Sequence, residues 1–95
     1  MIDTMTTAQN IVKSLASAFG GYSQIPNAVV GAAVFGRANN ASSPWSEEEA
    51  SRTVADCATV IDLHFDLEPG ETVNAIHTGY QNAWKSAEGT HAPEL

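Results

Sequence analysis

The sequence predicts an all-α protein, a compact bundle of four helices over residues 7–19, 26–37, 46–67 and 70–88. Alanine is frequent, which favours helix. Apolar residues recur at three- and four-residue spacing in the first, third and fourth segments. The 95 residues are enough for one domain, residues 1–95, with one modest core. Residues 90–95 are predicted to form a loose C-terminal tail.

The first helix is predicted to begin at about Thr7, because Thr6 and Gln9 have the spacing of a capping box. Gly20 and Gly21 should end it, since glycine adopts the left-handed conformation without strain. The residues of its predicted apolar face are Met5, Ala8, Val12, Leu15, Ala16 and Phe19.

The second helix is predicted to run from Pro26 to Arg37, because proline fits a first helical turn. Its residues are apolar nearly all round, which is typical of a helix buried on most sides. The small residues Gly31, Ala32 and Gly36 would let a neighbouring helix come close. A short buried strand is the alternative, since valine and phenylalanine favour strands. We favour a helix because the sequence has no second strand-like run to pair with it.

The third helix has the clearest start, a capping box of Ser46 and Glu49 followed by acids in the first turn. Its predicted buried stripe is Ala50, Val54, Cys57, Ala58, Ile61 and Phe65, widened by Val60, Leu63 and Leu67. The fourth helix follows a connector of residues 68–71, and its interior Gly79 suggests close packing. Its predicted stripe is Val73, Ile76, Tyr80, Ala83, Trp84 and Ala87.

The formal net charge is −7, divided as +1 over residues 1–45 and −8 over residues 46–95. An acidic half disfavours direct binding to nucleic acid or an anionic membrane and favours a basic protein surface, although acids also serve solubility. No apolar run is long enough to span a membrane, and the first residues lack the pattern of a signal peptide. We therefore expect a cytoplasmic protein.

No catalytic, cofactor or metal site is predicted. Cys57 and His64 lie seven residues apart on one helix, about 10.5 Å, which is too far for a nucleophile and its base. With His77 they match no zinc-binding spacing. The carboxylate pairs lie on a predicted solvated face, where no acid–base catalyst would be desolvated. We therefore expect a protein that is not an enzyme.

The acidic face of the third helix is the predicted binding surface. Asp62 and Asp66 form a repulsive pair near the helix C-terminus, the unfavourable end for acids, which suggests a use other than stability. From Glu48 to Asp66 the face covers about 27 Å, roughly one carboxylate per backbone phosphate of a nucleic-acid strand. The predicted partner-binding residues are Glu48, Glu49, Asp56, Asp62, Asp66 and Trp45.

The sequence between Ser46 and Glu49 resembles the acidic helix start of colicin-type immunity proteins, although their Tyr-Tyr-Pro segment is absent. In size, acidity and helical character the chain resembles nuclease-immunity proteins and phage-encoded anti-CRISPR inhibitors. This resemblance implies an antagonist that mimics nucleic acid on a basic protein. The alternative is a structural or oligomerising module of a phage or secretion apparatus, with the apolar second helix and Trp45 and Trp84 in a homodimer interface.

Overall fold

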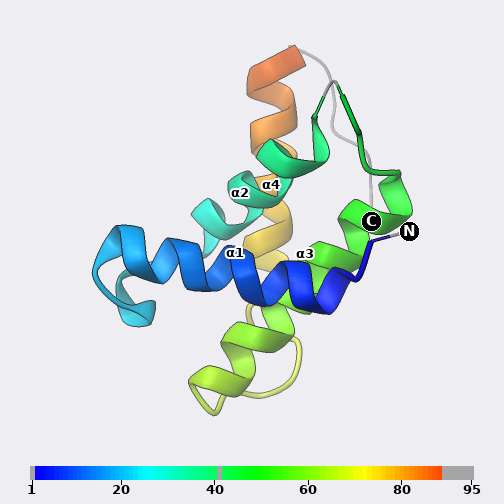
Figure 1. Cartoon of the computed structure of the whole chain (residues 1–95). Helices are drawn as coiled ribbons and strands as arrows, with labels where there is room; N and C mark the ends of the chain where they lie inside the picture. Colours follow the sequence, from blue (N-terminus) through cyan, green and yellow to red (C-terminus); the bar gives the residue numbers. More distant parts are fainter. Residues whose placement is uncertain (1, 41, 89–95) are drawn as a thin grey trace.

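The computed structural model describes residues 2–40 and 42–88 (Figure 1). They form four α-helices and a short 3₁₀ turn, with no strand among them. The elements are α1 (Thr4–Phe19), η1 (Tyr22–Gln24), α2 (Asn27–Ala38), α3 (Glu47–His64) and α4 (Val73–Glu88). The prediction of an all-α fold with four helices is confirmed, and the second segment is a helix. The predicted tail, residues 90–95, lies outside the described residues.

Helix α1 begins three residues earlier than predicted, because Asp3 rather than Thr6 caps it. The Asp3 carboxylate accepts the Thr6 N–H at 3.0 Å and the Thr6 hydroxyl at 2.8 Å. At the other end Gly20 takes the predicted left-handed conformation, with φ of 81°. An aspartate N-cap therefore moves the helix start to Thr4.

Helix α3 begins with the predicted capping box but ends three residues before Leu67. Glu49 donates its N–H to the Ser46 hydroxyl at 3.1 Å, and the Glu49 carboxylate accepts the Ser46 N–H at 3.0 Å. After His64 the chain turns out of the helix and reaches α4 only at Val73. The predicted start of α4 at residue 70 was therefore too early, since Gly70, with φ of 83°, lies in the intervening turn.

The most extensive helix–helix interfaces join α2 to α4 and α1 to α3 (Figure 1). The connections before α2 and before α4 are short, which by itself would favour pairing of helices adjacent in the sequence. Instead, α2 and α4 approach until Gly31 meets the backbone at Ile76 and Gly79 meets the backbone at Ala28. Gly36, also expected to favour close approach, has no neighbour at its Cβ position.

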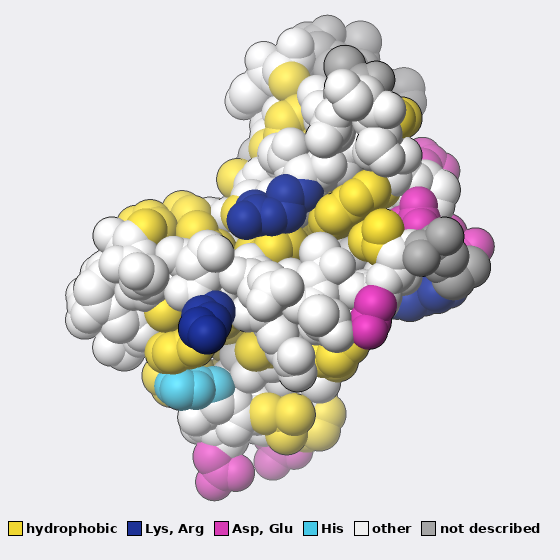
Figure 2. All heavy atoms as spheres, viewed as in Figure 1, with side chains coloured by type: hydrophobic (Ala, Val, Ile, Leu, Met, Phe, Trp, Pro, Cys, Tyr) yellow, Lys and Arg dark blue, Asp and Glu magenta, His cyan; other side chains and the backbone are white. Residues whose placement is uncertain are grey.

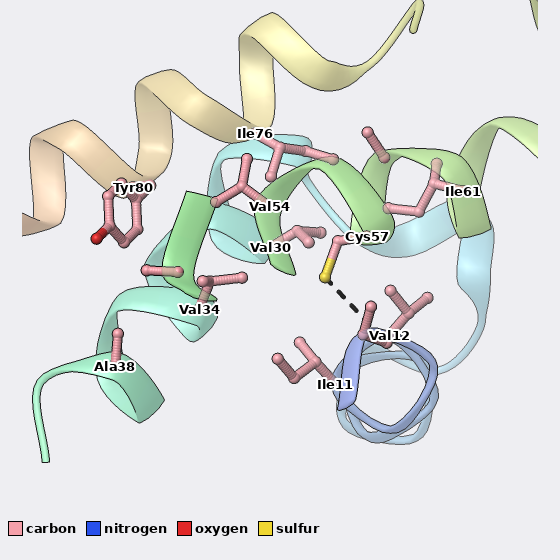
Figure 3. Packing of buried hydrophobic residues seen from close by; sticks show 13 residues of the cluster. Ile11, Val12, Val30, Val34, Ala38, Val54, Cys57, Ile61, Ile76 and Tyr80 are labelled. Carbon is pink, nitrogen blue, oxygen red and sulfur yellow. Dashed lines mark hydrogen bonds between the residues drawn. The ribbon is translucent and has the colours of Figure 1, made fainter. Parts of the chain in front are cut away.

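The core collects residues of all four helices (Figure 3). Ile11 is fully buried although the predicted apolar face of α1 omitted it, whereas Phe19 is 41% exposed. At the C-terminal end of α3 the predicted stripe was too wide. Leu63 is 77% exposed, and Phe65 and Leu67, which follow the last helical residue His64, are also exposed.

The apolar residues of α2 serve the fold itself. Val30 and Val34 are fully buried in the core, and Phe35 packs edge-to-face on Trp84 at a ring-centroid distance of 5.2 Å. Trp45 is half-buried, and it also packs against the core. The oligomerising alternative assigned the apolar residues of α2 to a dimer interface; in the structure Val30 and Val34 belong to the core, whereas Ala28 and Ala32 are exposed.

Candidate functional site

Cys57 lies in the core, apart from the surface histidine on its own helix. Its side chain is fully buried, and Sγ lies 4.0 Å from the Ala8 carbonyl oxygen of α1 (Figure 3). Burial raises the pKa of the thiol to about 12, so the reactive thiolate is not formed near neutral pH. The expected structural role of Cys57 agrees with this placement.

The histidines of the described helices contact aromatic side chains. His64 is exposed and stacks on Tyr22 at 4.1 Å between ring centroids, with Phe65 edge-on at 4.8 Å. His77 stacks on Tyr80, with 6.4 Å between the ring centroids and 22° between the ring planes. Within residues 2–40 and 42–88, no three histidine, cysteine or acidic side chains are grouped so that they could hold a metal ion.

Asp62 does not lie on an exposed acidic face, so that placement was wrong. Its side chain is 2% exposed and accepts three hydrogen bonds from the connector to α4. Two come from the N–H groups of Gly70 (2.9 Å) and Thr72 (3.2 Å), and one from the Thr72 hydroxyl (2.8 Å). A carboxylate accepting such bonds fixes the turn that brings α4 back onto the core. Asp62 therefore has a structural use, which explains its unfavourable position in the helix.

Asp66 also has a local structural use. It is the only residue other than glycine with positive φ in the described part of the chain, at 54°. The Leu67 N–H donates to the Asp62 carbonyl at 2.8 Å, and the Asp66 N–H donates to the Leu63 carbonyl at 3.3 Å. This pair of bonds around a left-handed residue is the Schellman motif that ends helices. Aspartate tolerates that conformation better than most residues.

Replacing Asp66 by glycine is expected to raise the free energy of unfolding by about 0.5–1 kcal/mol, because glycine has no Cβ to strain at positive φ. Urea denaturation of the two proteins checks this. Glu68→Gly is the matched control, since φ of Glu68 is not positive, and it should give no gain. A loss of stability in Asp66→Gly would contradict the assignment.

The remaining predicted acids gather where α1 begins beside the first turns of α3. The Ile2 N–H donates to the Glu49 carboxylate at 3.0 Å, and the Thr4 hydroxyl donates to Asp56 at 2.6 Å. These two bonds bring Asp3 close to the acids of α3. Asp3 was not among the binding residues predicted from the sequence. We call the start of α1 together with the first three turns of α3 the acidic end; the acids on these segments are Asp3, Glu47, Glu48, Glu49 and Asp56.

The acidic end carries strong negative charge at neutral pH. The Ser46 N–H, and then the Ile2 N–H, hold the pKa of Glu49 below its ordinary value. The Thr6 N–H likewise lowers the pKa of Asp3. Arg52 pairs with Glu48 one helical turn away. Figure 2 shows acidic side chains at one edge of the molecule near a basic one, with a second acidic group at the lower end.

Trp45, the aromatic member of the predicted surface, joins α2 to α3. Its N–H donates to the carbonyl of Ala38, the last residue of α2, at 3.1 Å. Its half-buried ring leaves part of the side chain available beside the acidic end. Of the predicted set, Trp45, Glu48 and Glu49 therefore lie at the start of α3 and Asp56 in its third turn, whereas Asp62 lies in the last turn of α3 and Asp66 in the turn after it.

No helix among the described residues combines the length and apolar character needed to cross a membrane. Comparisons with protein-family models, curated proteins and solved structures gave no match.

Proposed function

We propose that this chain is a non-enzymatic binding protein that docks its acidic end on a basic protein surface. The proposal rests on the hydrogen bonds from Ile2 to Glu49 and from Thr4 to Asp56. They hold the start of α1 against α3 and so bring Asp3 close to the acids of α3. Carboxylates held in fixed positions complement a basic patch and accelerate association at low salt.

The narrower form of the proposal is an antagonist of a cytoplasmic protein that handles nucleic acid. Such proteins carry basic grooves, and an acidic surface competes for them directly. The predicted row of carboxylates along the whole of α3 is interrupted, because Asp62 is buried. The mimicry therefore rests on the acidic end, where five carboxylates lie around the start of α1 and the first three turns of α3.

The test is capture of the partner from the source cells by the wild type and by a neutralised variant. Asp3→Asn, Glu47→Gln, Glu48→Gln and Asp56→Asn remove charge and keep hydrogen-bond acceptors, since asparagine caps helices as well as aspartate does. We expect the dissociation constant of this variant for the partner to rise at least tenfold, which corresponds to a loss of about 1.4 kcal/mol of binding free energy or more. High salt should release the wild-type complex.

The control is Glu71→Gln, which neutralises an exposed acid outside the acidic end. It should bind as the wild type does. Equal capture by the neutralised and wild-type proteins would overturn the proposal. Competition with duplex DNA tests the narrower form of the proposal. If the protein mimics nucleic acid, added DNA should displace it from its partner.

A further inference from the structure

A mostly apolar groove of about 450 Å³ lies at the other end of α3, between α1, η1 and α3. Met5 and Lys13 line it from α1, Tyr22 from η1, and Val60 and Leu63 from α3. Figure 2 shows this side of the molecule, where apolar atoms lie near a basic side chain, a histidine and the lower acidic group. None of these residues belongs to the acidic end.

Leu63 is both a wall of the groove and a projecting knob. It is 77% exposed, the largest value among the exposed large hydrophobic residues of the described chain. A smaller hollow of about 110 Å³ lies on its other side, lined by Leu67 and Pro69 among others. One face thus carries a knob between two hollows. A surface that presents both halves of a contact is self-complementary, as a two-fold dimer interface must be.

The charges near this face also match each other. Lys13 is the cation on the groove wall, and the acids Asp66 and Glu68 follow Leu63 closely in the turn. In the described chain, no hydrogen bond or ion pair involves the side chains of Lys13 or Glu68. A second copy related by a two-fold axis near Leu63 would bring its turn acids to Lys13, and reciprocally.

We propose that the protein forms a two-fold homodimer in which Leu63 of each copy enters the groove of the other and Lys13 pairs with Glu68 across the interface. This dimer leaves both acidic ends free. Two acidic ends on one particle would raise the avidity for a partner that presents two basic sites. The interface is distinct from α2, none of whose residues lines either hollow.

Sedimentation velocity over a wide range of protein concentration tests the dimer. The wild type should shift from monomer to dimer as concentration rises. Leu63→Gln should raise the dimer dissociation constant at least tenfold, and its fold should be unaffected because the side chain is exposed. Phe19→Gln is the matched control, an exposed apolar residue that lines neither hollow, and it should dimerise as the wild type does.

A charge exchange tests the orientation. Lys13→Glu alone and Glu68→Lys alone should each weaken the dimer, and the double variant should restore it, because a two-fold axis pairs the exchanged residues again. Glu68 is chosen over Asp66 because Asp66 also maintains the end of α3. A wild type that stays monomeric at every concentration overturns the proposal. So does a folded double variant that fails to dimerise, or a dimer that Leu63→Gln leaves intact.

Discussion

Replacing Gly31 or Gly79 by alanine is expected to lower the free energy of unfolding by about 3 kcal/mol or more. A Cβ at Gly31 would lie 1.9 Å from the Ile76 carbonyl oxygen, and one at Gly79 would lie 2.0 Å from the Ala28 carbonyl oxygen. Both clashes are with backbone, so no side-chain rotation relieves them. The helices α2 and α4 would have to separate, and with them part of the core.

The matched control is Gly36→Ala, in the same helix α2. A Cβ there meets no atom within 4 Å, so the substitution should raise stability by about 1 kcal/mol through helix propensity alone. Urea denaturation followed by circular dichroism measures all three variants. Since a domain of this size is stable by roughly 5–15 kcal/mol, a loss of this size is readily measured. If Gly31→Ala proved as stable as Gly36→Ala, the close crossing of α2 and α4 would be wrong.

Removing the Asp62 carboxylate should have the second large effect. Asp62→Ala leaves the Thr72 N–H and hydroxyl in a buried site without their acceptor, and hydrogen bonds to a charged group contribute about 1.5–3 kcal/mol each. The Thr72 hydroxyl retains the Ala58 carbonyl at 3.4 Å, which offsets part of the loss. We expect the free energy of unfolding to fall by about 3 kcal/mol in total. The turn that joins α3 to α4 should also open more readily than in the wild type.

Amide hydrogen exchange distinguishes this role from a general loss of stability. The Gly70 and Thr72 amides should lose protection in Asp62→Ala by more than the amides of α1 do. Asp62→Asn keeps one acceptor oxygen and should lie between the wild type and Asp62→Ala. Asp66→Asn makes the same change of charge on an exposed side chain and should leave both amides protected. Equal exchange in Asp62→Ala and Asp66→Asn would refute the carboxylate's role in the turn.

These assignments separate stability from binding along one helix. Asp62 and Asp66, which the sequence singled out for function, maintain the end of α3 and the turn after it. Glu48 and Asp56 remain on the surface that we propose for binding. Neutralising the acidic end should therefore change partner binding far more than folding, whereas Asp62→Ala should do the reverse.

The physical reason for the incorrect placement of Asp62 is that local rules consider one helix at a time. A like-charge pair near a helix C-terminus is unfavourable in isolation. The donors that satisfy Asp62 come from Gly70 and Thr72, eight and ten residues later in the chain. Helical periodicity contains no information about that turn. The same holds for Asp3, which reaches the acids of α3 only because Ile2 and Thr4 contact residues 47 and 52 positions away.

The sequence by itself determined the all-α class, the capping box at Ser46, the left-handed glycine at the end of α1 and the buried Cys57. Each depends on neighbours within a few residues or on a single periodic stripe. Only the tertiary structure decided that α2 pairs with α4, that Asp62 is internal and that Leu63 projects beside a groove. These features depend on how the helices cross, and helix crossing is set by contacts between segments distant in the sequence.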